Sequence, residues 1–216
     1  MPDPAAAETV NHPHFARIYM RMTSGRRDRG ENEYRERLLA GLTGQVIEVG
    51  AGNGLNFALY PPTVEKVLAV EPEPLLRQAA VEEADRAPTT IEVVDGVAGS
   101  LPAPDGSQDA GVASLVLCSV SDQERALAEL RRVIKPGGEL RFYEHVISDR
   151  AIASRLQRVA DATLWPRVAG GCHMARDTTA AIEAAGFAIE RIDRFPFSPG
   201  AVVPSIPHIL GMARRP

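Results

Sequence analysis

The residues best suited to chemistry are a run of glycines after a short apolar segment. The run reads Gly50-Ala51-Gly52-Asn53-Gly54, and Glu48 stands two residues before it. Glycines in such a turn let the backbone come close to a ligand, and the free N–H groups at the start of a helix attract negative charge. We expect a helix to begin at Leu55, so that the run forms a ligand-binding loop between a strand and a helix.

Two classes of nucleotide ligand compete for such a loop. The dinucleotide pattern G-x-G-x-x-G requires a glycine where this chain has Leu55, and a carboxylate at Glu48 is poorly matched to a pyrophosphate. A carboxylate suits a cationic ligand instead. Glu71 closes the second apolar run, where an acid can hydrogen-bond ribose hydroxyls in either class. Together these residues favour S-adenosylmethionine, with S-adenosylhomocysteine as its product, over NAD.

A second group of candidates is expected on the acceptor side. His145 follows the fifth apolar run, at the carboxyl edge of the expected sheet, where ligands bind. Its ordinary pKa of about 6.5 suits a catalytic base, and a loop histidine bonded to backbone is the alternative. His208 precedes the last apolar run and could reach the same edge, and Arg176 could equally pair with an acidic neighbour. The expected walls of a substrate pocket are Trp165, Cys172 and Arg176.

The two cysteines predict neither a disulfide framework nor a metal site. Cys118 and Cys172-His173 lie far apart in the sequence, and the chain has no C-x-x-C pair. We expect Cys118 to be a packed small residue. So few cysteines suit a reducing compartment.

Alternating strands and helices must position these residues. Apolar runs alternate with helical patterns from about residue 31 to 145, which predicts βαβ units and a parallel sheet with helices on both faces. The residues 136–138, Pro-Gly-Gly, are expected to form a turn. The expected strands are 45–49, 66–70, 90–94, 109–117 and 139–143, and the expected helices are 31–42, 55–59, 75–86 and 123–133. Beyond them we expect a helix over 178–185 and a hairpin of 187–191 with 209–214.

Length and composition agree with one ordinary globular domain. The chain has 216 residues, of which 44% are hydrophobic and 24% charged, and a net charge of -4. Mild acidity provides no general attraction for nucleic acid. No run approaches the roughly 18 apolar residues that span a bilayer, and residues 1–10 lack the pattern of a signal peptide. We therefore expect a cytoplasmic protein with no nucleic-acid partner and no integral membrane segment.

In order and spacing, these blocks resemble the class I S-adenosylmethionine-dependent methyltransferases. The blocks that carry the resemblance are 46–54, 70–72, 101–102 with 105–109, and 130–138. Later blocks, at 115–120, 143–146, 171–173, 176–178 and 207–209, are similar to one branch of that family. It contains the mammalian membrane-associated alkyl thiol methyltransferases, and its wider neighbours methylate quinone precursors and phospholipid head groups.

The resemblance implies a single doubly wound, Rossmann-like α/β domain over residues 1–216, with a seven-stranded, mostly parallel sheet and one antiparallel strand. It implies a cap over the cofactor in 1–30, a cofactor-binding core in 31–145, and substrate-side insertions with the last hairpin in 146–216. Val97 stands where relatives often carry Asp, so a side-chain bond to the adenine amine is lost. The residues implied at the cofactor are Tyr19, Glu48, Gly50, Ala51, Gly52, Gly54, Glu71, Pro72, Val97, Ala98 and Leu115.

The expected function is transfer of a methyl group to a small-molecule acceptor. A thiol is favoured by the resemblance, and with a pKa of about 8.5 it needs less help from a base than an alcohol does. The alternatives are an O- or C-methyltransferase of a secondary metabolite or quinone, an NAD-dependent oxidoreductase, and a cofactor-binding protein without turnover.

Overall fold

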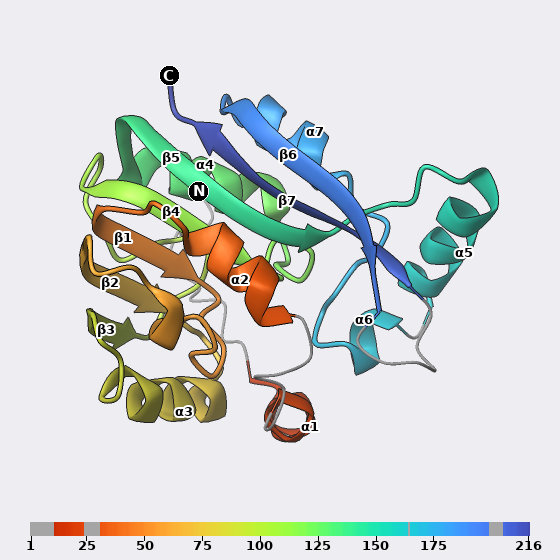
Figure 1. The fold of residues 1–216 in the computed structure, drawn as a ribbon. Helices are drawn as coiled ribbons and strands as arrows, with labels where there is room; N and C mark the ends of the chain where they lie inside the picture. Colours follow the sequence, from red (N-terminus) through yellow and green to blue (C-terminus); the bar gives the residue numbers. More distant parts are fainter. Residues whose placement is uncertain (1–10, 24–30, 164, 199–204) are drawn as a thin grey trace, which may run out of the picture.

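The computed structural model describes residues 11–23, 31–163, 165–198 and 205–216. Its centre is a seven-stranded sheet in the order β3-β2-β1-β4-β5-β7-β6 (Figure 1). The neighbours among β1 to β5 pair in parallel, whereas β7 is antiparallel to both β5 and β6. This confirms the mostly parallel sheet with one reversed strand. The strands are β1 (Gly44–Val49), β2 (Val64–Val70), β3 (Thr90–Val94), β4 (Gln108–Ser114), β5 (Ile134–His145), β6 (Ala188–Phe197) and β7 (Ile206–Arg214).

Helices cover both faces of the sheet, as a doubly wound fold requires (Figure 1). On one face, Val46 packs in a cluster with Leu38 of α2 (Glu31–Leu39) and with α3 (Pro74–Ala84). On the other, Ile47 packs in a cluster with α4 (Gln123–Val133) and α7 (Thr178–Ala184). Successive strand residues point to opposite faces, and both faces are buried here. For this reason the strands read as continuous apolar runs.

The helix expected at Leu55 does not form. The chain turns over 52–56 and then makes one short 3-10 helix, η2 (Phe57–Leu59). Pro61 and Pro62 follow at once, so the segment is too short to nucleate an α-helix. The glycine loop therefore meets no α-helix N-terminus, and this prediction was wrong.

Two strand boundaries also differ from expectation. The residues 136–138 do not form a separate turn but lie inside β5, whose register with β4 shifts between Gln108 and Ala110. This irregularity accommodates Pro136, which has no N–H to donate. The strand β4 ends at Ser114 rather than at 117, because Leu115 has a φ of 57°.

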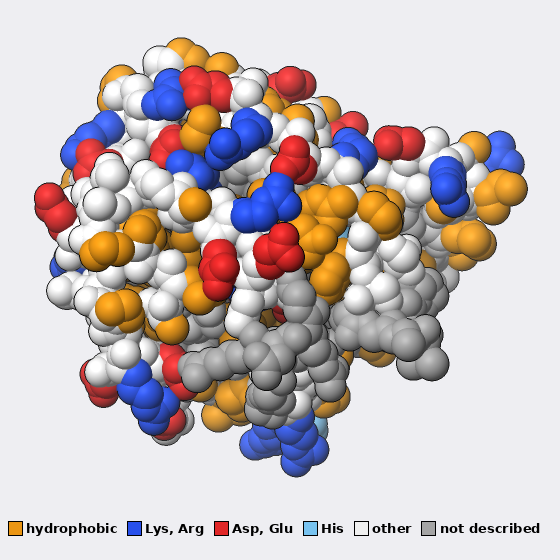
Figure 2. All heavy atoms as spheres, in the orientation of Figure 1, with side chains coloured by type: hydrophobic (Ala, Val, Ile, Leu, Met, Phe, Trp, Pro, Cys, Tyr) orange, Lys and Arg blue, Asp and Glu red, His pale blue; other side chains and the backbone are white. Residues whose placement is uncertain are grey.

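The segment after β5 contains two helices that the sequence pattern did not predict, α5 (Ala151–Asp161) and α6 (Trp165–Val168). In α5 the buried residues are the polar Ser154 and Gln157. The exposed apolar side chains of α5 are Ile152, Leu156 and Val159. Hydrophobic side chains gather on the surface over this helix (Figure 2). In most helices the apolar residues face the core, and α5 shows the reverse. For this reason the sequence pattern does not predict this helix.

The first described element is the helix α1 (Pro13–Thr23), which lies within the expected cap. The rest of the expected cap, 1–10 and 24–30, lies outside the described residues. Within the described ranges, no helix has the length and apolar character needed to cross a membrane.

Candidate active site

The glycine loop lies at the carboxyl end of β1 and is tied to the end of β2. The N–H groups of Gly50 and Ala51 donate to the carbonyl of Val70 at 2.9 and 3.2 Å. Gly50, Gly52 and Gly54 have φ angles of 64°, 58° and 78°. Residues with a Cβ avoid this left-handed region, so the path of the loop itself requires glycine.

The helix α1 lies directly over Gly52. A Cβ built at Gly52 would find the ring of Tyr19 at 3.6 Å as its nearest neighbour. The side chain of Asn53 also reaches α1, donating to Thr23 Oγ1 at 3.1 Å. The described part of the expected cap, α1, therefore covers the glycine loop, and Tyr19 is the α1 residue that lies over Gly52.

The carboxylate of Glu71 lies beside the same loop. Its Oε2 accepts the N–H of Gly52 at 2.8 Å, and its Oε1 accepts the N–H of Glu73 at 2.9 Å. Burial raises the pKa of Glu71, and these two hydrogen bonds oppose that shift. Each oxygen keeps a second lone pair, so the carboxylate can also accept hydroxyl protons from a ribose diol. The half-buried Pro72 follows, its carbonyl held by Arg77 at 2.9 Å.

The segment expected at the adenine lies next to the end of β2. A Cβ at Gly96 would stand 2.9 Å from Cγ1 of Val70. Val97 is half-buried and pairs with Ser100 in an isolated bridge, while Ala98 packs on the core. An adenine ring here would meet backbone and apolar side chains, which fits the loss of Asp at position 97.

Glu48 is buried beneath the glycine loop, and both of its oxygens accept hydrogen bonds from the protein. Asn56 Nδ2 and the Tyr60 hydroxyl each donate to it at 2.7 Å. Arg35 in turn donates to Asn56 Oδ1 at 2.9 Å. Burial raises the pKa of Glu48 from 4.5 to about 7, against the opposing effect of Tyr60 and Asn56. Glu48 is therefore hydrogen-bonded within the protein beneath the glycine loop. Its contact with a cationic ligand stays a prediction.

Glu144 organises the loop that follows β4. This fully buried carboxylate accepts the N–H groups of Val116 and Leu117 at 3.0 and 2.9 Å and that of Cys118 at 3.2 Å. Three successive amides around one anion form a nest. Burial raises the pKa of Glu144 to about 7, although the three amides lower it. Glu144 therefore shapes the loop that follows β4.

The turn at Leu115 brings this loop against the glycine loop. Leu115 is the only non-glycine residue with a positive φ in the described part of the chain, and its N–H donates to Tyr143 O at 2.7 Å. A Cβ at Gly50 would lie 2.3 Å from Cγ2 of Val116, so the two loops touch with no room between them. Leu115 thus lies at the junction where its contact with the cofactor is predicted.

Three side chains from distant parts of the sequence meet at the carboxyl end of β5. Sγ of Cys118 and Sγ of Cys172 lie 3.6 and 3.5 Å from Nδ1 of His145. Both cysteines are free and buried, and the three ligand atoms lie within 4.8 Å of one another. The fold therefore brings Cys118 and Cys172, which are far apart in the sequence, to one histidine.

The electrostatics of this cluster favour a thiolate at Cys172. The Cys118 thiol and the His145 ring lower the pKa of Cys172, against the effect of burial. The same contact with Cys172, together with burial, raises the pKa of Cys118. Burial by itself would lower the pKa of His145, but Cys172 raises it overall. The indole N–H of Trp165 also lowers the pKa of Cys172.

His208 and Arg176 support the cluster from two sides. The His208 ring lies edge-on to His145, with 4.5 Å between centroids, and its Nδ1 is 2.8 Å from the carbonyl of Ile206. Burial and the nearby His145 lower the pKa of His208 to about 4, so its ring is neutral at pH 7. Arg176 Nη1 donates to the carbonyl of Leu117 at 2.7 Å, and Arg176 makes no ion pair with an acidic residue in the described ranges.

An aromatic wall beside His208 was missed by the sequence analysis. Tyr143 stacks on His208 at 5.4 Å between centroids, and Phe197 meets the same ring edge-on at 5.4 Å. Tyr34 stacks on Phe195 at 4.3 Å. These residues come from α2, β5 and β6, so only the pairing of distant strands brings them together. The one local signal was the spacing of Phe195 and Phe197, which places both on one face of a strand.

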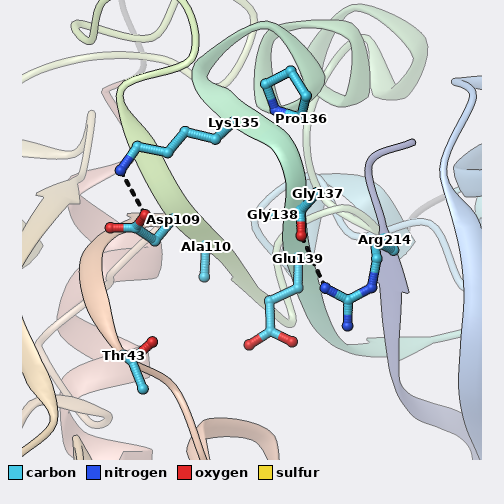
Figure 3. Close-up of a pocket in the computed structure, with 9 residues that line it drawn as sticks. All are labelled: Thr43, Asp109, Ala110, Lys135, Pro136, Gly137, Gly138, Glu139 and Arg214. Atoms are coloured by element: carbon cyan, nitrogen blue, oxygen red, sulfur yellow. Dashed lines mark hydrogen bonds and ion pairs between the residues drawn. The ribbon is translucent and has the colours of Figure 1, made fainter.

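A separate pocket of about 390 Å³ opens at the opposite edge of the sheet (Figure 3). Its lining includes the ion pair of Lys135 with Asp109 and the bond from Arg214 to the carbonyl of Gly137. These residues lie toward the amino ends of β4 and β5, whereas the glycine loop lies at the carboxyl ends. This pocket is therefore not part of the candidate site.

Comparisons with known proteins agree with this geometry. Residues 47–142 match the family described as "Methyltransferase domain". The thiol S-methyltransferase TMT1B of Rattus norvegicus is 36% identical, over 92% of this chain and 81% of the relative. The ubiquinone/menaquinone biosynthesis C-methyltransferase UbiE of Methylobacterium nodulans is 36% identical over 54% of this chain and 44% of its own length.

Solved structures share the fold at low sequence identity. A Bacillus halodurans protein superposes with a TM-score of 0.71 at 18% identity, covering 87% of this chain and all of the other. A SAM-dependent methyltransferase from Methanosarcina mazei superposes with a TM-score of 0.63 at 18% identity, covering 79% of this chain and 92% of the other. The fold, the family match and these relatives agree, and the chain therefore belongs to the class I S-adenosylmethionine-dependent methyltransferases.

Proposed function

We propose that this protein methylates the sulfur of a small-molecule thiol. The observation that carries the proposal is the junction of the two loops. The loop that packs on Gly50 through Val116 also carries Cys118 into contact with His145 and Cys172. A ligand over the glycine loop and an acceptor beside His145 would therefore be neighbours. The thiol S-methyltransferases among the relatives favour sulfur as the acceptor atom.

On the cofactor side, bound S-adenosylmethionine would supply a methyl group already activated by its sulfonium. Glu71 would accept the ribose hydroxyls, and the glycines would let the backbone pass close beneath the ligand. Tyr19 would cover the ligand from α1, and Glu48 would hold the floor. The residues that complete the proposed cofactor site are Ala51, Pro72, Val97, Ala98 and Leu115.

On the acceptor side, we propose His145 as the catalytic residue. A thiol is only a few per cent ionised at pH 7, and an imidazole beside it can take its proton. Trp165, Cys172, Arg176 and His208 would shape the pocket. The aromatic wall suits an apolar thiol, because its rings exclude water from the reacting atoms. A cytoplasmic location belongs to the same proposal, supported by the two free cysteines.

The test is a panel of small acceptors incubated with the protein and S-adenosylmethionine. Mass spectrometry should find a gain of one methylene unit on an alkyl thiol, at a higher rate than on a matched phenol or amine. Glu71→Gln is the control for cofactor dependence, and it should slow every transfer. Methylation of the phenol or the amine in preference to the thiol would refute the assignment of the acceptor.

A further inference from the structure

We propose that Cys118, His145 and Cys172 bind a zinc ion whose fourth position receives the acceptor thiol as a thiolate. The metal site stands on its own geometry. Its use in catalysis rests on the proposed function, because it requires a thiol acceptor.

The distances in the cluster fit a tetrahedral ion. Zinc binds sulfur at about 2.3 Å and histidine nitrogen at about 2.0–2.1 Å, so two tetrahedral ligands of these kinds stand about 3.5–3.6 Å apart. The two measured separations from Sγ to Nδ1 of His145 are 3.5 and 3.6 Å. An ion therefore fits without a change in either sulfur–nitrogen separation.

The backbone holds the ligands in place before any ion arrives. Glu144 binds the N–H of Cys118, and the N–H of His173 donates to the carbonyl of Cys118 at 2.8 Å. The amide of Cys172 is tied to Ala169 O at 3.1 Å. A Cβ at Gly171 would lie 2.9 Å from Ser119 O, so the two cysteine-bearing loops are in close contact. Such preorganisation is what a metal site requires.

Charge and ligand type also suit zinc. Two thiolates neutralise the ion and a neutral imidazole adds no charge, which permits burial. The indole N–H of Trp165, seven residues before Cys172, is buried and has no hydrogen-bond partner within the described residues, so it remains available as a donor to a metal-bound sulfur. Three protein ligands with one open position is the pattern of catalytic zinc, whereas structural sites have four protein ligands.

The open position gives the ion a chemical task. An acceptor R–SH that binds there loses its proton to solvent, since the ion stabilises the thiolate. A lone pair of that sulfur forms the bond to the methyl carbon. The bond from this carbon to the sulfonium breaks, and its electron pair stays on the departing sulfur of S-adenosylhomocysteine. The product R–S–CH₃ is a neutral, weaker ligand and leaves. The zinc keeps its oxidation state. In the zinc-bound form the ion ionises the acceptor and His145 acts as its ligand, whereas His145 itself takes the proton in a chain without the ion.

The experiment measures metal binding apart from activity. The full chain, reduced and stripped with a chelator, is titrated with Zn²⁺ against a chromophoric chelator, and with Co²⁺ for its absorption spectrum. We expect one ion per chain and a Co²⁺ spectrum with sulfur charge-transfer bands. Cys118→Ser and Cys172→Ser should each weaken Zn²⁺ binding at least about tenfold. His173→Asn is the matched control, since it changes a neighbouring histidine with a side chain 38% exposed, and it should bind as the wild type does.

The possible outcomes separate the metal from the proposed function. No uptake of Zn²⁺ or Co²⁺ by the reduced wild type overturns the site, as does an equal loss in His173→Asn. Retained binding of S-adenosylhomocysteine shows that the cysteine variants are folded. If a variant does not fold, the sulfur charge-transfer bands of the wild-type Co²⁺ spectrum test by themselves whether cysteine binds the metal. Zinc binding without thiol methylation supports the site and refutes the proposed function. Undiminished thiol methylation by the zinc-free chain refutes the catalytic use of the ion and leaves the proposed function intact.

Discussion

Replacing Gly52 with alanine adds one methyl group to the face of the glycine loop beneath α1. At a φ of 58° the alanine lies in the left-handed region, which costs about 1–2 kcal/mol. The added Cβ meets nothing closer than the Tyr19 ring at 3.6 Å, an ordinary contact. The variant should therefore fold, with a melting temperature lower by roughly 2–8 °C for a chain of this size.

The same methyl group would occupy the space through which a cofactor approaches the loop. We expect the affinity for S-adenosylhomocysteine to fall at least about tenfold, a loss of about 1.4 kcal/mol in binding free energy. Isothermal titration calorimetry measures the affinity, and a thermal melt of the same sample measures the stability.

Gly106→Ala is the matched control. Gly106 has a φ of 56°, and nothing lies within 4 Å of its Cβ position. It should show the same loss of stability with unchanged cofactor affinity. Gly50→Ala marks the other limit, because its Cβ would lie 2.3 Å from Val116 and should prevent normal folding. If Gly52→Ala binds S-adenosylhomocysteine as tightly as Gly106→Ala does, the loop is not the cofactor site.

Further predictions concern the buried carboxyls and His145. Glu144→Gln cannot accept from all three amides, so urea denaturation should show a loss of roughly 1.5–3 kcal/mol; an unchanged midpoint would contradict the nest. His145→Ala should lower kcat about a hundredfold with little change in affinity for S-adenosylhomocysteine, and an equal loss in both would make the residue structural. Burial raises the pKa of Glu48 from 4.5 to about 7, so the folded chain binds this proton more tightly than the unfolded chain does. The resulting contribution to the unfolding free energy is full below about pH 4.5 and is lost as the pH rises through 7. The advantage of wild type over Glu48→Gln in unfolding free energy should fall by about 3 kcal/mol between about pH 4.5 and pH 8, and a constant difference would contradict the raised pKa.

The positions of the residues proposed to bind the cofactor were largely predictable. The strand periodicity placed Glu48, the glycines and Glu71 at the carboxyl ends of adjacent parallel strands, because such strands all end at one edge of the sheet. The prediction of a helix at Leu55 failed for a local reason, since Pro61 and Pro62 leave too few residues for a stable helix. The acceptor half was less predictable, because its residues come from four separate segments.

By itself, the sequence determined the class of fold, the glycine loop and the position of His145 at the end of a strand, since each depends on local periodicity or on the backbone freedom of glycine. Only the tertiary structure decided that Cys118 and Cys172 both reach His145, and that Glu144 accepts hydrogen bonds from three successive amides. It also decided that α1 lies over Gly52. The contacts of Glu144 and His145 join segments 26 or more residues apart, and they form only when the loop after β4, the end of β5 and the loop before α7 converge at one end of the sheet.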